Sequence, residues 1–90
     1  MSERAVVRIV NQQGLHARPI SRFVQTVTKY RATVSVTGPD GTVADAASIF
    51  SMMTLAAGLG AELALEADGE QAREVLAALQ DLVAGGFGEK

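Results

Sequence analysis

The chain has 90 residues, of which 48% are hydrophobic, and its formal net charge is −2 at pH 7. This length suits a single domain over residues 1–90 with a modest core, and the hydrophobic fraction excludes a disordered chain. The mixed charges argue against a nucleic-acid partner, which usually meets a basic patch, and the absence of cysteine excludes disulfides and thiol chemistry.

The sequence also bears on where the protein resides. Its N-terminal stretch lacks a long apolar run, so we expect no signal peptide. Residues 46–61 carry no charge, but they include glycine, serine and threonine, and a bilayer span needs about 20 mostly apolar residues. We therefore expect a cytoplasmic protein without membrane insertion, which the lack of cysteine also fits.

The first half of the chain predicts a strand, a helix and a hairpin. Valine and isoleucine in residues 4–10 are typical of a strand, and residues 17–29 place apolar side chains at helical spacing. Residues 31–37 alternate between apolar and polar side chains, as a half-buried strand does. The Gly-Pro-Asp-Gly turn at 38–41 then leads into a short returning strand over 42–44.

The second half predicts helix, strand and helix. Residues 48–57 form a short helix with Ser48 as its N-cap, and residues 61–67 alternate as a second half-buried strand. Residues 71–84 carry the strongest helical stripe of the chain, and the glycine pair at 85–86 ends it.

The element order is therefore β-α-β-β-α-β-α, which is typical of the α+β class. Four strands with one half-buried face need one cover, which three helices on the same side supply. The hairpin implies an antiparallel sheet. We predict an open-faced, two-layer β-sandwich, with a four-stranded antiparallel sheet covered on one face by three helices.

The motif GLHARP at 14–19 contains the only histidine of the sequence, His16, directly after a turn and at the start of a predicted helix. Helix N-termini present unpaired amides and a positive dipole end, so they bind anions. Pro19 fits the first helical turn, and Arg18 adds a planar charged fork that suits phosphate oxygens. The motif therefore indicates an imidazole that handles phosphate, with the amides of Ala17 and Arg18 within reach of it.

Other roles for His16 find less support. A metal site needs more ligands, so we expect no metal and no organic cofactor. A hydrolase needs a nucleophile, a base and an orienting carboxylate, and the nearby Ser21 lies in no nucleophile elbow. Two interpretations stay open: a passive surface histidine in a small non-catalytic binding domain, or a neutral imidazole whose free ring nitrogen accepts a phosphoryl group.

Three stretches together resemble the HPr family, the histidine-containing phosphocarriers of bacterial phosphotransferase systems. They are GLHARP at 14–19, FVQTVTKY at 23–30 and AASIFSMMTLAAGLGAEL at 46–63. With the element order, the likeness covers essentially the whole chain. It implies an open-faced β-sandwich with strand order 1-4-2-3, and a phosphoryl-transfer intermediate rather than a turnover enzyme.

The resemblance assigns roles to individual residues. His16 is expected to accept a phosphoryl group from phospho-enzyme I on its δ1 nitrogen and to pass it to enzyme IIA components for sugar uptake. Arg18 corresponds to the family's active-site arginine. The same motif also occurs in nitrogen-branch regulatory relatives, which are the alternative.

Ser48 corresponds to a serine that an HPr serine kinase/phosphorylase modifies in many relatives, so regulatory phosphorylation is expected there. Ala47 argues against this, because kinase-regulated relatives often carry lysine at that position. Gln13 and Ile20 also depart from the family pattern, where asparagine or serine and alanine are usual. The sequence does not assign a role to either of them.

Large apolar residues crowd the short helix after Ser48. The simpler interpretation is that all four of them are buried in the core. However, four large side chains on two turns of a helix cannot all face inward, which favours partial exposure. The resemblance implies that Ile49, Phe50 and Met53 form an apolar docking patch beside His16. Methionine suits such a surface because it adapts to several partners. Nothing in the sequence indicates an oligomer, so we expect a monomer.

Overall fold

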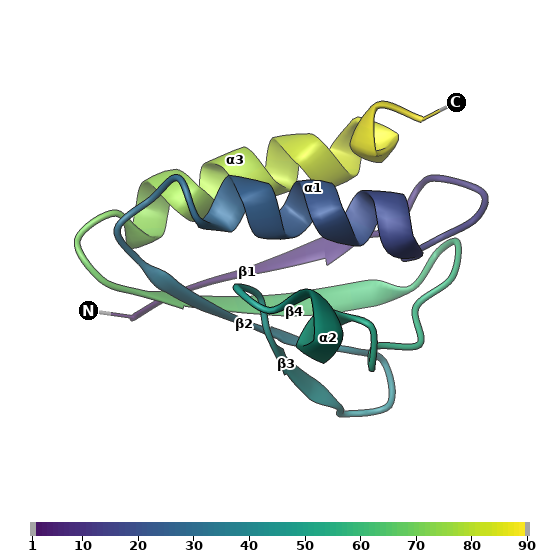
Figure 1. The fold of residues 1–90 in the computed structure, drawn as a ribbon, viewed down its shortest axis with the longest axis horizontal. Helices are drawn as coiled ribbons and strands as arrows, with labels where there is room; N and C mark the ends of the chain where they lie inside the picture. Colours follow the sequence, from purple (N-terminus) through teal and green to yellow (C-terminus); the bar gives the residue numbers. More distant parts are fainter. Residues whose placement is uncertain (1, 90) are drawn as a thin grey trace.

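The computed structural model describes residues 2–89, and the elements follow the predicted order (Figure 1). They are β1 (Ser2–Arg8), α1 (Ala17–Val27), β2 (Thr33–Thr37), β3 (Val43–Asp45), α2 (Ile49–Met52), β4 (Glu62–Asp68), α3 (Ala72–Ala84) and a short 3-10 helix, η1 (Gly86–Gly88). The predicted α+β class is confirmed. No helix of the described chain has the length and apolar character needed to cross a bilayer.

The four strands form one antiparallel sheet in the order β1-β4-β2-β3, as the family resemblance implied. Central strand β4 pairs with both β1 and β2, so Leu65 lies opposite Ala5 on one side and Val36 on the other. Inward side chains such as Leu65 are buried. The outward face carries exposed ion pairs, including Arg8 with Glu62 at 2.6 Å. This division gives the sheet one apolar face to cover.

Helices α1 and α3 lie side by side across that face (Figure 1). Each helix buries one stripe of side chains at helical spacing, which is how an amphipathic helix covers a sheet. The buried residues are Pro19, Ile20, Phe23, Val24 and Val27 from α1, and Ala72, Val75, Leu76, Leu79 and Val83 from α3. The shorter α2 packs against α1 and β3.

The main error in the predicted elements concerns α2. It ends at Met52 rather than near residue 57, while the other helix and strand boundaries agree within two residues. Residues 53–57 are apolar enough for a helix, but their backbone makes hydrogen bonds outside a helix. The carbonyl of Ala57 accepts a hydrogen bond from the amide of Leu15 at 2.8 Å. This contact ties the segment after α2 to the loop before α1.

Beyond the predicted end of α3, the chain forms the 3-10 helix η1. Phe87 at its centre is fully buried although its φ is +58°. A non-glycine residue in this left-handed region costs about 1–2 kcal/mol, and burial of a phenyl ring contributes about 1.5–3 kcal/mol, so burial outweighs the strain. Arg22 of α1 also donates a hydrogen bond to the carbonyl of Phe87. Together these contacts fix η1 against the N-terminal half of α1.

Candidate functional site

His16 is the N-cap residue of α1, at the point where a loop turns into the helix. Its backbone is extended, with φ −119° and ψ −168°, and its carbonyl accepts a hydrogen bond from the amide of Ile20 at 3.0 Å. Its side chain makes no capping hydrogen bond. Within residues 2–89, the amides of Ala17 and Arg18 have no acceptor, as expected for the first turn of a helix.

Gly14 holds the loop in a conformation that other residues rarely adopt. Its φ is +70°, and a β-carbon at this position would lie 2.6 Å from the carbonyl oxygen of Ala57 and 2.7 Å from the α-carbon of Gly58. The side-chain amide of Asn11 donates a hydrogen bond to the carbonyl of Gly14 at 2.8 Å. Gly14 therefore allows the loop to approach the 57–58 segment closely, which fixes the position of His16.

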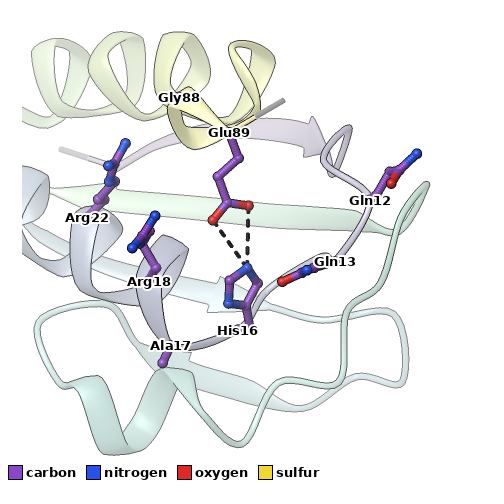
Figure 2. Close-up of a pocket in the computed structure, with 8 residues that line it drawn as sticks. All are labelled: Gln12, Gln13, His16, Ala17, Arg18, Arg22, Gly88 and Glu89. Carbon is purple, nitrogen blue, oxygen red and sulfur yellow. Dashed lines mark hydrogen bonds and ion pairs between the residues drawn. The ribbon is translucent and has the colours of Figure 1, made fainter.

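The side chains around His16 enclose a surface hollow of about 610 Å³ (Figure 2). It is lined by Gln12, Gln13, His16, Ala17, Arg18, Arg22, Gly88 and Glu89. Arg18 and Arg22 lie on consecutive turns of α1, and both point toward Gly88 and Glu89 (Figure 2). The imidazole is 35% exposed, so a partner in solution can reach it. The hollow combines an accessible ring nitrogen with two guanidinium groups, which suits an anionic group.

One nitrogen of the imidazole ring is already in contact with a carboxylate. The Nε2 atom of His16 lies 3.2 Å from Oε2 and 3.4 Å from Oε1 of Glu89 (Figure 2). The side chain of Asn11 also donates to Oε1, at 3.0 Å. In the described part of the chain, the other ring nitrogen, Nδ1, makes no hydrogen bond. Nδ1 is thus the nitrogen that is left for other chemistry.

A protein-family model and sequence comparison place this chain in a known family. The model of the PTS-HPr family, described as the PTS HPr component phosphorylation site, matches residues 3–85. The chain belongs to the HPr family of phosphocarriers. A phosphocarrier protein HPr of Neisseria meningitidis is 42% identical over 83 residues, which cover 92% of each chain. A phosphocarrier protein NPr of Klebsiella oxytoca is 36% identical over 89 residues, 99% of each chain.

A solved structure also matches the fold of this chain over nearly its whole length. The crystal structure of HPr-C-His from Thermoanaerobacter tengcongensis has a TM-score of 0.91 at 36% identity and covers 98% of both chains. The family resemblance seen in the GLHARP motif and in the element order is therefore confirmed.

The structure brings together three of the residues that the sequence singled out. His16, Ala17 and Arg18 all line the hollow. Pro19 is the third residue of α1 and lies in its first turn, as predicted. Ser48 is the N-cap of α2, as predicted, because its Oγ accepts a hydrogen bond from the amide of Ser51 at 3.2 Å.

The large apolar residues of α2 divide between the core and the surface. Met52 is fully buried, whereas Ile49 is 46%, Phe50 86% and Met53 58% exposed. The alternative that all four lie in the core is therefore wrong. Because α2 packs against α1, these exposed side chains lie on the element next to the helix whose N-cap is His16.

Sequence reasoning missed five residues that contact or line the site: Asn11, Gln12, Arg22, Gly88 and Glu89. Glu89 lies 73 residues beyond His16 in the sequence, and Asn11 lies 78 residues before Glu89. No local spacing predicts such contacts. The position of Arg22 one turn after Arg18 is the only signal that the sequence offered, since residues four apart share a helix face.

The geometry of the loop generates a stability prediction. Gly14→Ala lowers the free energy of unfolding by about 1–3 kcal/mol, because the new β-carbon meets backbone atoms and the residue keeps a positive φ. Gly58→Ala is the matched control, since a β-carbon there has no atom within 4 Å, and its effect stays within about 0.5 kcal/mol. Urea denaturation measures both, and equal losses would contradict the role given to Gly14.

Proposed function

We propose that this protein carries phosphoryl groups on Nδ1 of His16, accepting them from phospho-enzyme I and passing them to enzyme IIA components for sugar uptake. In this role it is a phosphoryl-transfer intermediate rather than a turnover enzyme. The observation that carries the proposal is a partly exposed imidazole whose Nδ1 has no hydrogen-bond partner among residues 2–89, next to the unpaired amides of a helix N-terminus.

A carrier must accept and release its cargo with little change in free energy, so it cannot bind the phosphoryl group deeply. An open hollow at the surface suits this requirement better than a closed pocket. During in-line transfer, negative charge spreads over the three equatorial phosphoryl oxygens. The amides of Ala17 and Arg18 and the guanidinium of Arg18 stabilise that charge, while Pro19 has no amide to offer.

The exposed side chains of Ile49, Phe50 and Met53 form a docking patch for protein partners in this proposal. An apolar patch beside a reactive group supplies binding energy through burial when a partner covers it. Phe50 is its main anchor, because it is an aromatic residue with 86% of its surface exposed. The same patch serves enzyme I and the IIA components in turn.

Ser48 gives this surface a site for regulation by a serine kinase. A phosphoryl group there adds a charge of about −1.5 to −2 at the start of α2, where a helix tolerates negative charge. The helix stays folded, but the patch that begins at Ile49 becomes anionic and repels acidic partners. Ala47 stands where kinase-regulated relatives often carry lysine, which argues against recognition of Ser48 by such a kinase.

The nitrogen-branch role is the second candidate, and the likeness to the Klebsiella oxytoca NPr favours it. The stretch FVQTVTKY at 23–30 instead favours the sugar branch. Transfer from the phosphorylated protein to a sugar-type IIA and to a nitrogen-type IIA, measured side by side, separates the two roles.

A direct test of phosphoryl acceptance uses mass spectrometry. After incubation with phosphoenolpyruvate and a general enzyme I, the protein gains one phosphoryl group that acid removes, and His16→Ala gains none while it stays folded. Ser21→Ala is the control and accepts the group normally, because Ser21 lies outside the hollow. Phosphorylation of the His16→Ala protein by this route would refute the assignment.

The docking patch generates a separate binding prediction. Phe50→Glu raises the dissociation constant for enzyme I about tenfold or more, because a charge replaces an apolar anchor, and it leaves stability nearly unchanged. Val6→Glu introduces the same charge at a valine that is 62% exposed on the open face of the sheet, and it serves as the control. Titration calorimetry measures both variants, and equal affinities would exclude this patch.

A further inference from the structure

We propose that Glu89 is a positioning residue for His16, and that its carboxylate keeps the ring proton on Nε2 so that Nδ1 presents its lone pair to the incoming phosphoryl group. This inference rests on the proposed function, since it concerns the nitrogen that takes the phosphoryl group. It is carried by the contacts of 3.2 Å and 3.4 Å between Nε2 and the two carboxylate oxygens.

The first step of the argument concerns the proton. An ionised carboxylate can only accept hydrogen bonds, and a neutral imidazole has one N–H group and one nitrogen with a free lone pair. The hydrogen bond made by one ring nitrogen decides which nitrogen carries the proton. With Glu89 at Nε2, the favoured tautomer has its proton on Nε2 and leaves Nδ1 free.

The second step concerns how firmly Glu89 is held. Its side chain is 19% exposed, whereas the carboxylates of the other ion pairs, Glu62, Glu66 and Glu70, are between 39% and 61% exposed. Exposed pairs contribute little to structure because the side chains stay mobile and solvated. Glu89 instead follows η1, whose Phe87 is buried and whose backbone is bonded by Arg22.

The third step concerns Asn11, which is 5% exposed. Its Nδ2 donates to Oε1 of Glu89 at 3.0 Å and to the carbonyl of Gly14 at 2.8 Å, while its Oδ1 is buried and has no partner in the described chain. A buried oxygen without a partner is unfavourable. The opposite amide orientation would set that oxygen against two acceptors. Asn11 therefore acts as a donor that fixes the carboxylate and the loop together.

The fourth step follows the charge during transfer. The lone pair of Nδ1 forms the new bond to phosphorus, and the bond from phosphorus to the donor nitrogen breaks with its electron pair left on the donor. Nε2 keeps its proton, so the ring of His16 gains positive charge as the bond forms. The Glu89 carboxylate stabilises that charge, as an orienting carboxylate does for a histidine in acyl transfer.

The negative charge of Glu89 does not oppose the arrival of an anionic group, because Arg18 and Arg22 line the same hollow. When the phosphoryl group leaves for the next partner, the ring returns to the neutral tautomer with the proton still on Nε2. The carboxylate thus serves acceptance and release alike.

The test measures the tautomer of His16 directly, without any partner. Nitrogen-15 shifts of the imidazole at alkaline pH give the ratio of Nε2–H to Nδ1–H forms. In Glu89→Ala this ratio falls about tenfold, the scale expected for one lost charge-assisted hydrogen bond. Glu89→Gln keeps the side-chain size, but its amide can also donate to the ring, so the ratio falls there too.

Glu70→Ala is the matched control, because among residues 2–89 Glu70 pairs only with the exposed Arg31, and it follows β4 at the end of the molecule opposite to η1 (Figure 1). It leaves the ratio unchanged. An unchanged ratio in Glu89→Ala would overturn the proposal even if the protein accepts phosphoryl groups.

The rate of phosphoryl acceptance from phospho-enzyme I provides the second measurement. It falls about tenfold in Glu89→Ala and stays normal in Glu70→Ala. A shifted tautomer ratio with an unaltered rate would overturn the inferred role in transfer. If the wild-type protein itself accepts no phosphoryl group while the ratio still shifts, the proposed function fails instead.

Discussion

The functional site depends on one constraint: His16 occupies the N-cap of α1 but does not cap it. A capping side chain would bind the free amides of the first turn, and the ring would be unavailable. Here the ring lies against Glu89, while the amides of Ala17 and Arg18 stay unpaired in the described chain. The same helix end therefore offers a nucleophilic nitrogen and the donors for the group that this nitrogen would carry.

The rest of the fold keeps this arrangement in place. The loop before α1 is held by Gly14 against the segment after α2, and η1 is held by the buried Phe87 against the core. Both contacts join segments that lie far apart in the sequence. The sheet supplies the rigid base, since α1 packs on its apolar face through a continuous buried stripe. The imidazole ring of His16 is thus accessible, while the groups that surround it are fixed.

Much of the fold could be predicted because it follows from local periodicity and local caps. Alternation predicted β2 and β4, a helical stripe predicted α1 and α3, and Ser48 was recognised as an N-cap from its type and place. The predicted end of α2 was wrong because the backbone of the segment after Met52 bonds to the amide of Leu15 instead of continuing the helix. The exposure of Phe50 stayed ambiguous, and Glu89 was missed, because both depend on how distant segments pack rather than on neighbours in the sequence.

The central claim is that a phosphoryl group on His16 meets the free amides of the α1 N-terminus. The most direct measurement compares amide proton and nitrogen shifts before and after phosphorylation by enzyme I. The amides of Ala17 and Arg18 should show the largest downfield changes, because they begin to donate to phosphoryl oxygens, while the amide of Val24 inside α1 changes little. Changes at Ala17 and Arg18 no larger than at Val24 would contradict the account.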